Sequence, residues 1–155
     1  MYQKKIHLYL NSIILYSIIN YEKNLVRWYK NKGETMIYFV GDKPSKKNID
    51  KNVAFVGTRS YKTLLDWIYR MNLSINSICL FNHARFIETN DDRIWSSFDA
   101  VIALGNEASK VLTKENIPHL KIPHSSGKNF LLNDKKAVDK FLKECKDYIG
   151  EHNAS

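Results

Sequence analysis

The chain has 155 residues, which is the size of one ordinary domain and too short for a second full one. Hydrophobic residues make up 44% and aromatic residues 12%, enough to bury a core, while six glycines and three prolines exclude a fibrous or low-complexity chain. The formal net charge of +8 favours a polyanionic partner, either nucleic acid or an acidic membrane surface.

Residues 1–35 differ in composition from the rest of the chain. The run 6–19 is mostly apolar but is interrupted by polar side chains, and a membrane span needs about 20 mostly apolar residues, so we expect no membrane crossing. Apolar residues at spacings of three and four from Ile14 to Trp28 indicate an amphipathic helix. Two other interpretations stay open. The segment is a signal peptide, or it lies outside the natural product, since Met36 begins a strand directly and can be a start residue.

Four short apolar runs have the length of buried strands, and helical patterns separate them. The expected strands are 37–40, 77–81, 100–104 and 120–122. The expected helices are 64–71 with Ser60 available as a cap, one from Asn106, and a last one from Asn133 or Asp134 to Ile149. Strands alternating with helices require crossover connections, hence a mainly parallel sheet. The sequence predicts an α/β three-layer sandwich with a mainly parallel four-stranded sheet over residues 36–150, followed by a tail at 151–155.

Cysteine and histidine spacing argues against a metal site. Cys79 and Cys145 form no CxxC or Cys/His pattern, so the sequence predicts neither a disulfide framework nor a zinc or iron-sulfur site. The five histidines lie in separate segments without the paired spacing of metal ligands. We expect a reduced, cytoplasmic protein that acts as a monomer without a metal or other cofactor.

Polar residues follow each expected strand, at the edge where ligands bind in parallel sheets. Taken in chain order, five segments resemble motifs of the uracil-DNA glycosylase superfamily. Gly41-Asp42-Lys43-Pro44-Ser45 is similar to its Gly-acid-x-Pro-Gly loop, residues 52–57 to its Pro-Phe-Val-Gly segment, and Asn82 to an asparagine at a strand end. Residues 101–108 resemble its Leu-Gly-x-x-Ala segment, and 124–129 its His-Pro-Ser motif.

The resemblance spans 36–149 and implies the uracil-DNA glycosylase fold. Two residues depart from the family pattern. Ser45 stands where the family usually has glycine or an aromatic residue, and Ser125 stands where it usually has proline. With two cysteines, the chain resembles the branches without an iron-sulfur cluster.

Cleavage of an N-glycosidic bond passes through a cation-like sugar and a departing base that gathers negative charge. A carboxylate can orient the attacking water and stabilise the cation, a role that the resemblance assigns to Asp42. A donor aimed at the base oxygen stabilises the leaving anion, a role that fits His124. The structural alternatives are a turn-forming aspartate and a surface-loop histidine.

Three further residues are expected to bind the base. The amide of Asn82 offers a donor and an acceptor for a base edge, and the ring of Phe55 offers a stacking face, although Phe55 could equally belong to the core. His83 would contact the base or sugar, or make a structural hydrogen bond. The expected contacts to the DNA backbone are basic and small polar residues of the same edge: Lys43, Ser45, Arg59, Ser125, Ser126, Gly127, Lys128 and Asn129.

The sequence thus predicts a DNA glycosylase that flips and hydrolytically removes uracil or another modified base. Two alternatives stay open: a non-catalytic protein that binds DNA or a base on the same fold, and an enzyme that acts on a free nucleoside or nucleotide. Repair, phage DNA metabolism and conflict with a host are all compatible with this chemistry. The abundance of Lys, Asn and Ile is typical of an AT-rich bacterial or phage genome.

Overall fold

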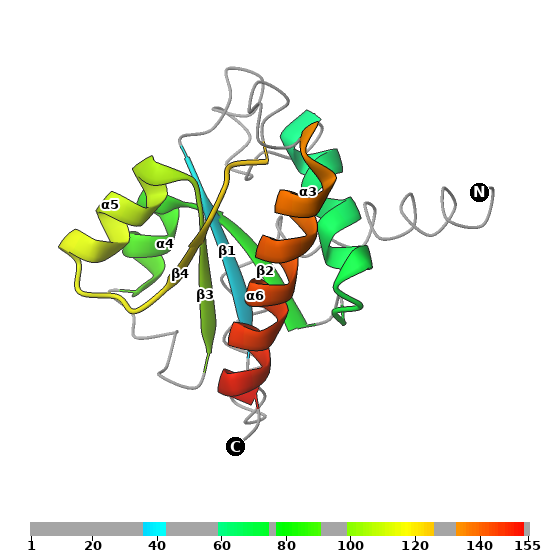
Figure 1. Ribbon diagram of the computed structural model, residues 1–155. Helices are drawn as coiled ribbons and strands as arrows, with labels where there is room; N and C mark the ends of the chain where they lie inside the picture. Colours follow the sequence, from blue (N-terminus) through cyan, green and yellow to red (C-terminus); the bar gives the residue numbers. More distant parts are fainter. Residues whose placement is uncertain (1–35, 43–58, 75–76, 91–98, 126–132, 154–155) are drawn as a thin grey trace.

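The computed structural model describes residues 36–42, 59–74, 77–90, 99–125 and 133–153, with only the backbone at 59, 85 and 88–90. Strands and helices alternate along these residues (Figure 1). In chain order they are β1 (Ile37–Gly41), α3 (Arg59–Arg70), β2 (Ile78–Asn82), α4 (His83–Asn90), β3 (Ala100–Leu104), α5 (Asn106–Lys114), β4 (Leu120–Ile122) and α6 (Lys135–Asn153).

The four strands form one all-parallel sheet in the order β2-β1-β3-β4. Ile37 lies between Ile78 on one side and Ala100 on the other, so β1 and β3 are the central strands. The predicted α/β fold with a parallel four-stranded sheet is confirmed, and each predicted strand agrees with the observed one to within one residue at either end. Because all strands run the same way, their carboxyl ends share one edge of the sheet.

Helices cover both faces of the sheet (Figure 1). Alternate strand residues such as Phe39 and Ile102 pack under α3 and α6, which we call the α3/α6 core. The intervening residues, such as Tyr38 and Val101, pack under α4 and α5 in the α4/α5 core. This division follows from the two-residue period of a strand, which sends successive side chains to opposite faces. Each core also contains one buried cysteine, Cys145 in the first and Cys79 in the second.

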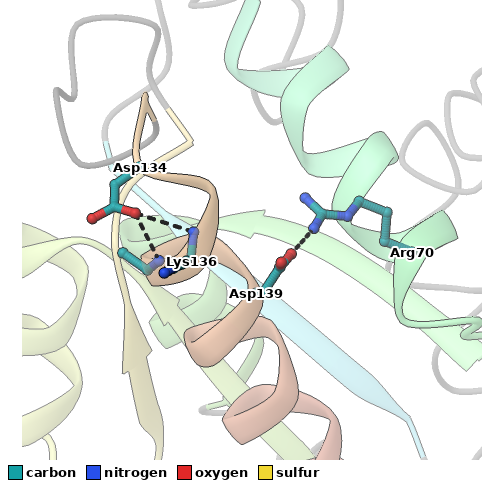
Figure 2. Close-up of polar contacts among 5 residues, drawn as sticks. Arg70, Asp134, Lys136 and Asp139 are labelled. Carbon is teal, nitrogen blue, oxygen red and sulfur yellow. Dashed lines mark hydrogen bonds and ion pairs between the residues drawn. The ribbon is translucent and has the colours of Figure 1, made fainter.

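Side-chain contacts hold α3 and α6 together over the α3/α6 core. The rings of Trp67 and Phe141 meet edge to face with centroids 5.1 Å apart, a favoured arrangement of aromatic pairs. Nearer the surface, the Arg70 guanidinium donates to the Asp139 carboxylate (Figure 2). The side chains of this ion pair are 36% and 64% exposed, so water screens it and we expect the aromatic contact to contribute more to stability.

The helix starts test two capping predictions. Asp134 accepts hydrogen bonds from the backbone N–H groups of Lys136 and Ala137 at 3.1 and 3.2 Å, so its predicted role as the cap of α6 is confirmed (Figure 2). The prediction for Ser60 is wrong, because α3 already begins at Arg59 and Ser60 lies in its first turn. At the other end of the chain, α6 continues through Asn153 into the segment that we expected to be a tail.

Among the described residues, no helix combines the length and the apolar composition that a membrane span requires. Residues 1–35, for which we expected an amphipathic helix, a signal peptide or a segment outside the natural product, lie outside the described residues.

Candidate functional site

Polar side chains from all four strand ends meet at the carboxyl edge of the sheet. Asp42 follows β1, His83 follows β2, Glu107 lies in the first turn of α5 after β3, and His124 follows β4. Two ion pairs join them: Asp42 with His124, and His83 with Glu107. The sheet therefore gathers four titratable groups from distant parts of the chain into one cluster, which we call the edge cluster.

The first pair joins residues that are 82 positions apart in the chain. His124 Nε2 lies 3.4 Å from Asp42 Oδ2, and the two side chains are 28% and 35% exposed. The predicted meeting of these residues at one sheet edge is confirmed, whereas their catalytic roles stay predictions. Partial burial leaves both groups accessible to a ligand while removing much of their hydration.

The surroundings of Asp42 act on its pKa in opposite directions. Burial, the largest effect, raises the pKa of the Asp42 carboxyl, and the negative charge of Glu107 raises it further. His124, a hydrogen bond from the Ala108 N–H and His83 lower it, but the net pKa lies above the usual value of an aspartate. Since Ala108 is in the first turn of α5, Asp42 also ties the end of β1 to that helix.

Gly105 supports the ring of His124. It precedes α5 with φ 94° and ψ 179°, a conformation that is open almost exclusively to glycine. A Cβ added at this position would lie 3.1 Å from the His124 Cβ and 3.4 Å from its Cδ2, closer than most real contacts. The Leu-Gly pair that ends β3 thus has a packing function: the glycine lets the loop after β4 approach the end of β3.

The second pair lies between α4 and α5. His83 Nε2 is 3.3 Å from Glu107 Oε1; the His83 side chain is 11% exposed and the Glu107 side chain 45%. The structural hydrogen bond weighed for His83 is therefore present. Asn82, expected to read a base edge, is the last residue of β2 and is 6% exposed.

A hollow of about 380 Å³ adjoins His124 on the β3/β4 side of the edge. It is lined by Gly105, Asn106, Lys121, Ile122, Pro123 and His124. Lys121 Nζ donates to Asn106 Oδ1 at 3.1 Å, which holds the ammonium group at the hollow. Sequence reasoning missed Lys121; the available signal was a lysine between two apolar residues in the short run 120–122, which places it on the exposed side of an edge strand.

Several predicted contacts to the base or to the DNA backbone fall outside the described residues. These are Lys43, Ser45, Phe55, Ser126, Gly127, Lys128 and Asn129, and only the backbone of Arg59 is described. Ser125 is described and is fully buried, and its Oγ has no hydrogen-bond partner among the described residues. Its hydroxyl is thus enclosed beside His124, away from the surface on which we expected a backbone contact.

The remaining described histidines are held by their own neighbours. His119 Nδ1 donates to the Ile117 carbonyl at 2.8 Å, which leaves Nε2 to accept from the Ser109 hydroxyl at 2.8 Å. His152 Nδ1 donates to the Tyr148 carbonyl one turn earlier in α6. Among the residues that the structure describes, no group of three His, Cys, Asp or Glu side chains could hold a metal ion. The carboxylates and imidazoles of the edge cluster can transfer protons and make hydrogen bonds.

Comparison with known proteins found no matching family model and no matching curated protein.

Proposed function

We propose that the chain is a DNA glycosylase that extrudes uracil or another modified base from DNA and hydrolyses its N-glycosidic bond. The observation that carries the proposal is the pairing of Asp42 with His124 at the carboxyl edge of the sheet. A carboxylate and an imidazole in contact supply the two groups that this hydrolysis needs, one for the water and one for the departing base. The net charge of +8 suits a polyanionic substrate.

In the proposed reaction, Asp42 serves the attacking water. Its side chain is 35% exposed, and Oδ2, which now faces His124 Nε2 at 3.4 Å, can accept from a water molecule when that contact opens. The raised pKa makes the carboxylate a stronger base than a fully hydrated aspartate. As the bond from the sugar carbon to the base nitrogen breaks, the water oxygen bonds to that carbon and the water proton passes to Asp42.

His124 serves the leaving group. The electron pair of the broken bond departs with the base, and an imidazole N–H directed at a base oxygen stabilises the resulting charge. Because Nε2 now lies 3.4 Å from Asp42, the nucleotide has to replace this contact when it enters. Asn82 and His83, on the opposite side of Asp42 in the sheet order, are the proposed contacts to the base edge.

The test is incubation of the protein with oligonucleotides that carry uracil, hypoxanthine or other modified bases, in single and double strands, followed by detection of abasic sites. Expression hosts contain their own uracil-excising enzymes, so an Asp42→Asn protein purified in parallel is the matched control. Release of a base by the intact protein and its loss in the control support the proposal. Tight binding without release from any substrate would make the protein a non-catalytic DNA-binding module, and release only from free nucleosides would make it an enzyme of nucleotide metabolism.

Lys121 provides a prediction about the contact of the protein with the DNA backbone. If its ammonium group neutralises a DNA phosphate at the hollow beside His124, Lys121→Gln should reduce the slope of log affinity against log salt by about 1. Lys114→Gln is the control, because Lys114 is an exposed lysine in the last turn of α5. The measurement is fluorescence anisotropy of a labelled oligonucleotide across a salt series. An unchanged slope for Lys121→Gln would remove this residue from the DNA-binding surface.

A further inference from the structure

The pair formed by His83 and Glu107 bridges two strands that are not neighbours in the sheet. His83 begins α4 directly after β2, and Glu107 is the second residue of α5 after β3. In the strand order β2-β1-β3-β4, the strand between them is β1, whose end carries Asp42. The 3.3 Å contact of the two side chains therefore reaches across the strand end that holds the proposed catalytic carboxylate.

Each described element packed around Asp42 contributes a charge or a dipole toward it. The segment after β4 contributes His124, α4 contributes His83, and α5 contributes the Glu107 carboxylate and the Ala108 N–H. Glu107 is the one negative side chain in this set, and it opposes ionisation of Asp42, whereas the histidines favour ionisation. Because Glu107 contacts His83, the carboxylate and the imidazole are held together across the end of β1.

We propose that Glu107 is a positioning residue of the reaction: its carboxylate holds the imidazole of His83 across the end of β1, so that both groups stay beside Asp42 and set the pH range in which that carboxylate accepts a proton from water. The inference rests on the proposed function for the identity of the reaction, but the arrangement of charges does not. Glu107 acts through Asp42 and His83 and touches no reacting atom.

Two substitutions test the effects of Glu107 and His83 on Asp42 separately. Glu107→Gln keeps an oxygen that can accept from His83 but removes the negative charge, so the Asp42 carboxyl should lose its proton at lower pH. His83→Gln removes the imidazole, so the same carboxyl should lose its proton at higher pH. Since Glu107 is 45% exposed and water screens its charge, we expect a displacement of about half a pH unit for Glu107→Gln. A purely structural contact would move both variants in the same direction or move neither.

The experiment follows the Asp42 carboxyl carbon by NMR between about pH 3 and pH 8, with the titration range chosen around the ordinary aspartate value. It compares the intact chain with Glu107→Gln, His83→Gln and the control Glu115→Gln, which removes an exposed carboxylate after the far end of α5. Thermal melts of the four proteins establish that each is folded. We expect a lower midpoint for Glu107→Gln, a higher one for His83→Gln and an unchanged one for Glu115→Gln.

Single-turnover excision across the same pH range adds the second readout, and its acidic limb should move with the NMR midpoint of each variant. If the Asp42 midpoint is the same in Glu107→Gln and in the intact chain, the inference is overturned, whatever the excision rates are. If the midpoints move as expected but the intact chain excises no base, the proposed function fails while the positioning of Asp42 by Glu107 stands. The two failures are thus distinguishable.

Discussion

Asp42→Asn and His124→Ala should each slow single-turnover base excision by about 10²- to 10⁴-fold, the usual range for a lost acid-base or oxyanion contact. Asparagine is the better replacement for Asp42, because its amide oxygen can still accept from the Ala108 N–H while it no longer takes a proton. His124→Ala removes the donor to the departing base. DNA binding should persist in both variants, since neither removes a backbone contact.

Asp147→Asn and His152→Ala, both in α6, are the matched controls and should leave excision unchanged. The measurement is release of the base from a labelled oligonucleotide with enzyme in excess, beside a binding assay on the same substrate. Undiminished excision in Asp42→Asn would assign the catalytic role to other residues.

The same carboxylate predicts a pH dependence. Asp42 accepts a proton only when it is ionised, so excision should fall as the pH falls through its pKa. Because burial and Glu107 raise that pKa, the decline should begin at a higher pH than an ordinary aspartate would give. In Asp42→Asn the residual excision should lack this acidic limb, which distinguishes Asp42 from other titrating groups.

Gly105→Ala should destabilise the fold by about 1 to 3 kcal/mol and also reduce excision. Alanine is strained at φ 94° and ψ 179°, and its Cβ would lie 3.1 Å from the His124 Cβ, so either the loop or the ring has to move. The loss of stability follows from the backbone, and the loss of excision follows from the displaced imidazole. Denaturant unfolding and single-turnover excision measure the two effects separately.

Gly150→Ala is the control, and we expect it to change stability in the opposite direction. Gly150 lies in α6 with no atom within 4 Å of an added Cβ, so alanine there should stabilise the helix by about 0.5 to 1 kcal/mol. A Gly105→Ala protein as stable as the intact chain would show that the end of β3 relaxes around the new side chain.

Most of the fold could be predicted from the sequence because its strands are short, buried and continuous in apolar residues. The α4 helix was missed, since 83–90 forms a helix of two turns in which the described apolar side chains include Phe86, fully buried, and Ile87, partly buried. Its position follows from tertiary structure: the chain turns into α4 directly after Asn82, at the end of β2. Local periodicity carries little information over such a length.

Part of the candidate site was predictable from the same pattern of buried parallel strands. Residues that follow parallel strands share one edge, which brings Asp42 and His124 together without knowledge of the strand order. The pair of His83 with Glu107 depends on that order, because β1 and β3 have to be central for α4 and α5 to approach across Asp42. No local pattern in the chain contains this information, and the role of Lys121 at the hollow depends equally on β4 being the edge strand.

Each core of the sheet contains one cysteine, so thiol labelling can follow the two faces of the sheet separately. Cys79 and Cys145 are both buried thiols outside any disulfide, one on each side of the sheet, and burial raises the pKa of Cys145 to about 12. Thiol reagents attack the thiolate, so Cys145 should react only when α6 lifts from one face of the sheet, and Cys79 only when α4 or α5 lifts from the other face. With Cys79→Ser and Cys145→Ser as single-thiol proteins, labelling rates under native conditions would report separately on detachment of α6 and on opening of the α4/α5 face.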